Sequence, residues 1–130
     1  LVEKFAPGDV FHVDGLNVNG KVKFARVSKY LDTPFEVAHG GGIFRSATSK
    51  IGSKIEKDLQ KMNAQVMKAF GMQSGASHTE FIQSKATGEL FFLETSSRVG
   101  GANLAEMLFT RFSYLRTSGN ADSEPRRKGK

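Results

Sequence analysis

Hydrophobic and polar positions alternate with a period of two along residues 9–30. One side of this pattern carries Val10, His12, Asp14, Leu16 and Val18. Asn19-Gly20 follows, and this dipeptide favours a hairpin because a type I′ turn needs positive φ at both central positions. Alternation resumes over residues 21–27, so the pattern predicts two antiparallel strands joined by a tight turn. Thr33-Pro34 then ends the strand pattern.

A helical period replaces the alternation over residues 53–70. The apolar stripe consists of Ile55, Leu59, Met62, Val66 and Phe70. Ser53 and Glu56 predict a capping box at the start, and Gly71 a stop at the end. The polar face is expected to carry Glu56, Lys57, Lys61 and Lys68.

Strand patterns return at Ser77 to Gln83 and at Leu90 to Thr95, with Gly88 in the turn between them. A short helix is expected from about 103 to 109. The order predicts an α+β domain: an antiparallel sheet of two hairpins, with one long helix packed on it and a short C-terminal helix. Residues 39–42, His-Gly-Gly-Gly, predict a flexible loop before the long helix.

The composition narrows the class of protein. The chain has 130 residues, which suits one domain, and no cysteine, which excludes disulfides and thiolate metal sites. No apolar run approaches the ~20 residues of a membrane helix, and no signal peptide is visible. A cytoplasmic protein without a membrane partner is the expectation.

The net charge of +6 is concentrated at the C-terminal end. Residues 111–130 hold six basic and two acidic residues, or +4, which leaves +2 for the rest. We expect residues 109–130 to form a basic, disordered tail. An alternative function is a small basic module that binds nucleic acid or acidic partners through this tail. Against nucleic acid, the aromatic residues alternate as core positions and do not interleave with the basic cluster.

Two glutamates provide the candidate chemistry. A turn at 86–88 would pair residue 84 with 90, 82 with 92 and Glu80 with Glu94. Opposed carboxylates destabilise a sheet unless a cation or a proton lies between them. Oxygen ligands without thiols favour magnesium or manganese, and Arg98, further along the same face, would suit phosphate oxygens. The alternative is that both glutamates extend into water from a solvated face.

The flanking residues favour the first interpretation, since Phe81, Phe91 and Leu93 are expected to point to the core on the other face. A histidine metalloenzyme is a further alternative. It lacks support because His12, His39 and His78 are too scattered to form a recognisable ligand motif.

Five segments in order resemble the ATP-grasp enzymes. They are residues 2–9 (VEKFAPGD), 12–15 (HVDG), 38–42 (AHGGG), 78–81 (HTEF) and 92–101 (FLETSSRVGG). The likeness extends over residues 1–108 and is nearest to the carboxylate–amine ligases, with biotin carboxylase and carbamoyl phosphate synthase more distant. It implies a partial ATP-grasp fold, the carboxy-terminal half of that domain.

The resemblance also implies roles. ATP would be bound by the hinge strand and the residues after it: Glu3, Lys4, Phe5, Ala6, Asp9 and His12. Asp9 takes the place of the acid that binds ribose. Glu80, Glu94 and Ser96 would hold magnesium (or manganese), and Arg98 would be catalytic, stabilising the transferring phosphoryl group. Ser96 departs from the family, which often has Asn there.

The implied reaction activates a small-molecule carboxylate as an acyl phosphate, which an amine then attacks. ATP and magnesium are the implied cofactors. The family's amino-terminal half, with its nucleotide-binding lysines, is missing from these residues and would be the expected partner. The isolated chain is therefore expected to be inactive or nearly so.

Overall fold

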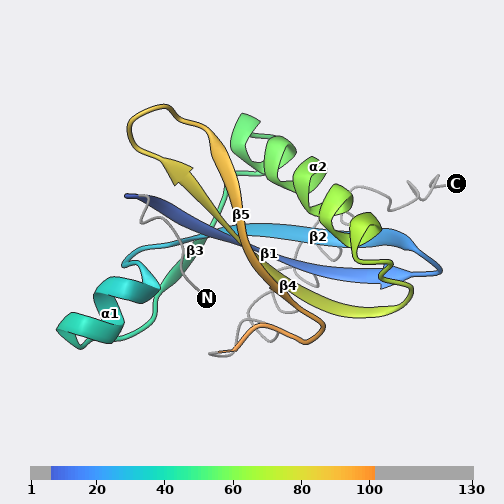
Figure 1. Cartoon of the computed structure of the whole chain (residues 1–130), viewed down its shortest axis with the longest axis horizontal. Helices are drawn as coiled ribbons and strands as arrows, with labels where there is room; N and C mark the ends of the chain where they lie inside the picture. Colours follow the sequence, from blue (N-terminus) through green and yellow to red (C-terminus); the bar gives the residue numbers. More distant parts are fainter. Residues whose placement is uncertain (1–6, 102–130) are drawn as a thin grey trace, which may run out of the picture. The chain divides into compact units, whose positions relative to one another are not determined.

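The computed structural model describes residues 7–101. The expected hinge residues Glu3, Lys4, Phe5 and Ala6, the short helix at 103–109 and the tail at 109–130 lie outside this range. Seven elements follow one another within the unit Leu1–Gly100: β1 (Gly8–Val18), β2 (Lys21–Tyr30), α1 (Pro34–Gly40), β3 (Ser46–Thr48), α2 (Lys54–Ala69), β4 (Gly75–Ser84) and β5 (Leu90–Ser96) (Figure 1). Neither described helix is long and apolar enough to span a membrane.

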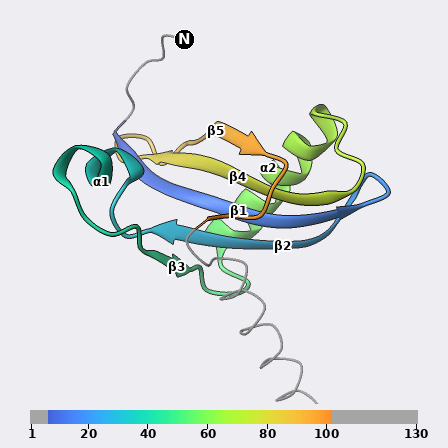
Figure 2. The ribbon, with the colours of Figure 1, turned by 90° about the horizontal axis from the view of Figure 1, so that it is seen from below.

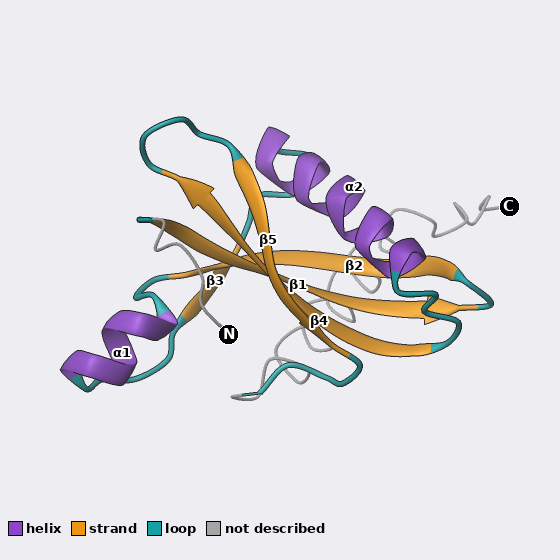
Figure 3. Ribbon diagram, in the orientation of Figure 1, coloured by secondary structure: helices purple, strands orange, loops and turns teal. Residues whose placement is uncertain are grey.

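The strands form one antiparallel sheet in the order β3-β2-β1-β4-β5 (Figure 3). The expected α+β architecture, two hairpins carrying one long helix, is confirmed. Asn19 and Gly20 have φ of 51° and 71°, as the predicted turn requires. Central β1 joins the two hairpins, because it pairs with β2 on one side and β4 on the other.

Helix α2 covers one face of the sheet (Figure 2). The core on that face is made of Phe11, Val13, Val27, Leu59 and Phe81. Side chains alternate along a strand, so the intervening residues of β1 and β4 point to the face away from α2. Those residues include His12, Asp14, His78 and Glu80.

The buried line of α2 differs from the predicted apolar stripe. Phe70 lies beyond the last helical residue and is 67% exposed, whereas Met67 is buried. Glu56 was expected on the polar face, but it is buried because Arg26 of β2 pairs with it. The capping box is only half formed. Ser53 accepts the Glu56 amide, while the Glu56 carboxylate accepts the amide of Gly52 instead of that of Ser53.

The segment predicted as a loop at 39–42 is partly helical, since α1 ends at Gly40. Thr33 caps this helix in a reciprocal capping box with Glu36, and Pro34 occupies its first turn. The Thr-Pro-x-Glu spacing could have predicted α1. Only Gly41 and Gly42 remain outside it, with φ of 71° and 144°.

The second hairpin has a different register from the predicted one near its turn. Ile82 pairs with Phe91 and Gln83 with Leu90, and a bulge between Glu80 and Phe81 then restores the pairing of Glu80 with Glu94. The bulge also corrects the predicted faces of β5. Phe92, and not Phe91 or Leu93, lies beside Phe81, with ring centroids 6.2 Å apart, although all three side chains are exposed.

Candidate functional site

Polar side chains gather on the face of the sheet opposite α2. The pairing of β1 with β4 sets His12 beside Glu80 and Asp14 beside His78. The pairing of β4 with β5 adds Glu94 opposite Glu80 and Ser96 opposite His78. Three strands therefore bring together residues that are up to 84 positions apart in sequence.

Asp14 lies between the two histidines. Its Oδ2 accepts a hydrogen bond from His12 Nδ1 at 2.7 Å, and its Oδ1 accepts one from His78 Nδ1 at 2.8 Å. Burial alone would raise the pKa of this carboxyl, but the two histidines outweigh it and lower the pKa to about 2. Asp14 is thus a buried, ionised acceptor.

His12 is completely buried, and both of its ring nitrogens are occupied. Nδ1 donates to Asp14, and Nε2 lies 2.6 Å from the hydroxyl of Ser46, which therefore donates to it. The His12 ring also lies between Tyr30 and His78, at centroid distances of 4.8 and 5.2 Å. His12 therefore has no free ring nitrogen with which to contact ATP directly in this arrangement.

Three of these ligand-type side chains are close enough to hold a metal ion: His12, Asp14 and His78 have candidate ligand atoms within 4.8 Å of one another. The sequence-based view that the histidines are too scattered is wrong for this pair, although His39 lies apart on α1, where it contacts the carbonyl of Phe35. Both Nδ1 atoms already bond to Asp14, however, so the trio is satisfied as a hydrogen-bond network.

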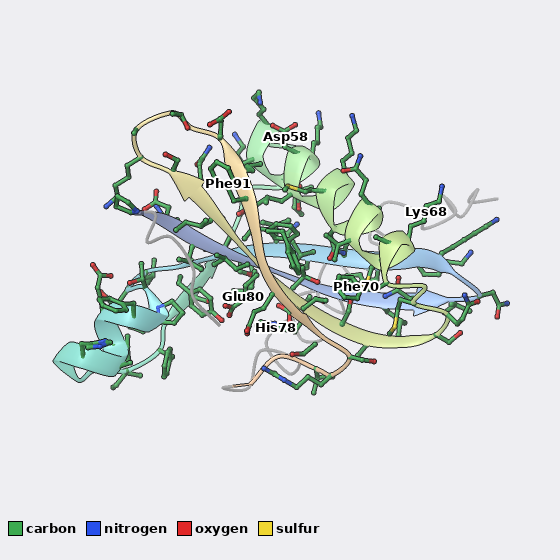
Figure 4. All side chains as sticks on the ribbon, viewed as in Figure 1. Asp58, Lys68, Phe70, His78, Glu80 and Phe91 are labelled. Atoms are coloured by element: carbon green, nitrogen blue, oxygen red, sulfur yellow. The ribbon has the colours of Figure 1, made fainter. Side chains whose placement is uncertain are left out.

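Glu80 is held by two neighbours at a single oxygen. The Tyr30 hydroxyl donates to Oε1 at 2.7 Å, and His78 Nε2 lies 3.4 Å from the same atom. Figure 4 labels Glu80 and His78, which lie near each other on β4. Burial disfavours the Glu80 charge, but His78 and Tyr30 outweigh it, so its pKa is lowered. Burial and the Glu80 charge raise the pKa of Tyr30, which keeps the hydroxyl proton in place as a donor.

The partner carboxylate, that of Glu94, is exposed. Beyond the backbone pairing of β4 with β5, no hydrogen bond or ion pair joins the side chain of Glu94 or that of Ser96 to another residue between 7 and 101. Arg98 is also exposed, and its guanidinium donates to the carbonyl of Val99 at 3.0 Å.

This donor set fits a hard divalent cation. Two carboxylates stand opposite each other, one of them held ionised by its hydrogen bonds and the other without a partner among the described residues. A hydroxyl at Ser96 adds a further oxygen one pleat along. Carboxylate and hydroxyl oxygens are ligands that magnesium and manganese prefer.

Asp9 is not brought to this cluster. It pairs with Gln83 along the strand, shares the α2 face with Phe11, and binds Lys29 at 2.7 Å. Gly41 and Gly42 line a hollow of about 370 Å³ beside α1, together with Asp32 and Arg45. The expected nucleotide contact of Asp9 stays a prediction.

Tyr30 and Ser46 were not predicted from the sequence to lie at this site. Tyr30 and Ser46 are paired residues of β2 and β3. On the sheet face opposite α2, Ser46 contacts His12 and Tyr30 contacts Glu80. Their sequence surroundings carry no pattern that would have indicated this, because the contacts depend on β3, which was not predicted, and on the position of β1 between β2 and β4.

Comparison with known proteins bears on the fold. An L-arginine-specific L-amino acid ligase of Bacillus subtilis is 29% identical over 115 residues, which are 87% of this chain and 27% of that protein. An L-amino acid ligase from Bacillus licheniformis superposes with a TM-score of 0.61 at 21% identity, over 79% of this chain and 25% of that one. The expected resemblance to ATP-grasp ligases is confirmed.

A second solved structure has the same partial fold. It is D-alanyl-alanine synthetase A from Vibrio cholerae, with a TM-score of 0.58 and 14% identity over 90% of this chain and 40% of that one. The described residues thus have part of the fold of ATP-grasp ligases. The chain spans about a quarter of the length of the curated relative that it matches. No protein-family model matches the chain.

Proposed function

We propose that this chain is the magnesium- and ATP-binding part of an ATP-grasp ligase that activates a carboxylate as an acyl phosphate for attack by an amine. The observation that carries the proposal is the opposed pair Glu80 and Glu94, on the sheet face opposite α2 in a partial ATP-grasp fold. The names of the similar ligases suggest amino acids as the class of both substrates.

Each residue of the site has a role in this proposal. Glu80 and Glu94 bind magnesium, and the Ser96 hydroxyl adds a weaker oxygen ligand. Magnesium bound there would neutralise and position the triphosphate for phosphoryl transfer. Arg98, whose guanidinium is exposed, binds the oxygens of the transferred phosphoryl group. The residues of the polar face contribute charge and position, and no protein nucleophile is required.

The 130-residue chain is expected to have little ligase activity alone, because its similar ligases are several times longer. Residues 3–6, which the resemblance assigns to adenine, lie outside the described part. So does the basic segment at 109–130, on which the alternative of a nucleic-acid-binding module rests. Within the described residues nothing favours that alternative.

Calorimetric titration of the 130-residue chain with ADP and ATP, with and without magnesium, tests the proposal. Wild type should bind nucleotide only with magnesium, and Glu94→Gln should lose this binding because an amide supplies no negative charge. Glu89→Gln is the matched control, since Glu89 is an exposed glutamate of the same hairpin whose carboxylate, within residues 7–101, bonds only to the Thr87 hydroxyl.

The outcomes separate the possibilities. Binding that is equal in wild type and Glu94→Gln would contradict the metal assignment. Absence of binding by a folded chain calls for the same titration with the amino-terminal half of an ATP-grasp domain restored. If the restored domain does not bind nucleotide with magnesium either, the proposed function is refuted.

A further inference from the structure

The contacts of Glu80 are unequal between its two oxygens. Oε1 accepts the Tyr30 hydroxyl at 2.7 Å and lies 3.4 Å from His78 Nε2. Oε2 has no hydrogen bond to any residue in the described range 7–101. Within the described residues the hydrogen bonds to this carboxylate are therefore confined to Oε1, and the side chain is 15% exposed.

Tyr30 reaches this position across an intervening strand. It lies on β2, whereas Glu80 lies on β4, and β1 separates the two. The Tyr30 ring crosses β1 over His12, at a centroid distance of 4.8 Å, and its hydroxyl then meets Oε1. A tyrosine in this place packs against His12 and also delivers a donor to a half-buried carboxylate.

His78 is fixed from its other nitrogen. Its Nδ1 donates to Asp14 Oδ1 at 2.8 Å, and Asp14 Oδ2 in turn accepts from His12 at 2.7 Å. The last hydrogen bond of this series joins His12 Nε2 to the Ser46 hydroxyl, at 2.6 Å. Because Asp14 is at most 10% exposed and both of its oxygens are engaged, the His78 ring has little freedom to rotate away from Glu80.

We propose that Tyr30 and His78 are positioning residues that hold Oε1 of Glu80, so that Oε2 alone is presented to the divalent cation. This inference rests on the proposed function, since it needs Glu80 to be a metal ligand. A ligand fixed by its outer hydrogen bonds loses less conformational freedom on binding. Removing such an outer partner typically weakens metal binding about 10–100-fold.

The test uses Mn²⁺ alone, added to the 130-residue chain, with free Mn²⁺ measured by electron paramagnetic resonance. Tyr30→Phe removes only the hydroxyl and should raise the Kd for Mn²⁺ about tenfold or more. His78→Asn keeps an amide near the Nδ1 position for Asp14 but loses the group that faces Glu80, so it should also weaken binding. His78→Gln places an amide near the Nε2 position and should retain more of the affinity.

Thr79→Val is the matched structural control. It removes the Thr79–Thr95 hydrogen bond of 2.9 Å, between the same two strands but on the α2 face. It should lower the melting temperature and leave the Kd for Mn²⁺ unchanged. A merely structural role for Tyr30 would instead make affinity follow the melting temperature in all variants.

Two results would overturn the inference, and they are distinguishable. If Tyr30→Phe and His78→Asn bind Mn²⁺ as wild type does while Glu80→Gln does not, the metal site stands and the positioning role is wrong. If Glu80→Gln binds as tightly as wild type, or wild type does not bind, the proposed metal site fails and the inference with it. If Tyr30→Phe does not fold, the inference is tested by the Kd for Mn²⁺ of His78→Asn compared with that of His78→Gln. Equal values in these two variants would contradict the positioning role.

Discussion

Glu80 of β4 and Glu94 of β5 stand opposite each other, although the hairpin is out of its predicted register by one residue nearer the turn. The bulge between Glu80 and Phe81 compensates for that displacement. It inserts one extra residue into β5, which returns the two carboxylates to the same face. Bulges are often found beside functional sites, and this one separates the apolar turn end of the hairpin from its polar end.

The same bulge pairs Phe92 with Phe81 and Phe91 with Ile82, so Phe92 and not Phe91 shares the α2 face with Phe81. Alternation alone predicted the opposite, because it assumes one residue on each strand per step. The pair Glu80–Glu94 was thus predicted correctly from a register that was wrong at 82 and 84. A period-two pattern contains no information about an inserted residue.

A core substitution on α2 provides the first stability prediction. Leu59→Ala should lower the free energy of unfolding by about 2–5 kcal/mol, because Leu59 is fully buried against Phe11 and Phe81. Phe70→Ala should change it by less than about 0.5 kcal/mol, since Phe70 is exposed beyond the helix end. Urea unfolding of both variants measures this. Equal losses would mean that the predicted stripe, with Phe70 in it, is the true core face.

Local patterns predicted those features whose cause is local. The turn at Asn19-Gly20 follows from backbone conformation, and the extent of α2 follows from its cap and apolar period. Glu56 looked like a surface residue because its partner, Arg26, belongs to another element. Tyr30 was missed for the same reason, since its contact with Glu80 spans 50 residues.

The ion pair between Arg26 and Glu56 leads to the second prediction. The Arg26 side chain is 12% exposed and that of Glu56 5%, and Arg26 also donates to the carbonyl of Ser49 at 2.7 Å. Arg26→Ala would leave a buried carboxylate with only the Gly52 amide, so we expect a loss of about 3 kcal/mol in the free energy of unfolding.

Lys54→Ala is the control for that measurement. Lys54 pairs with Asp58 on the surface of α2, and its side chain is 91% exposed. Such pairs contribute little, so the urea midpoint should hardly move. A similar midpoint for Arg26→Ala and Lys54→Ala would contradict a structural role for the buried pair.

The network of Asp14 and His78 predicts a stability that depends on pH in both directions. Burial opposes the charge on His78, but Asp14 and Glu80 outweigh it and raise its pKa from 6.5 to about 9. The resulting stabilisation is complete below pH 6.5 and is lost as the pH rises through about 9. The pKa of Asp14 is lowered from 3.8 to about 2, so its contribution is present above pH 3.8 and is lost as the pH falls toward about 2.

Stability should therefore be greatest between these limits and decline on both sides, which urea midpoints measured across the range would show. His78→Gln removes the group that titrates on the alkaline side but leaves a polar side chain in the strand. Its midpoint should be lower than that of wild type at pH 6.5, and it should fall less between pH 6.5 and about 9. An alkaline decline as steep in His78→Gln as in wild type would show that another group causes it, and that the His78 proton does not stabilise the polar face.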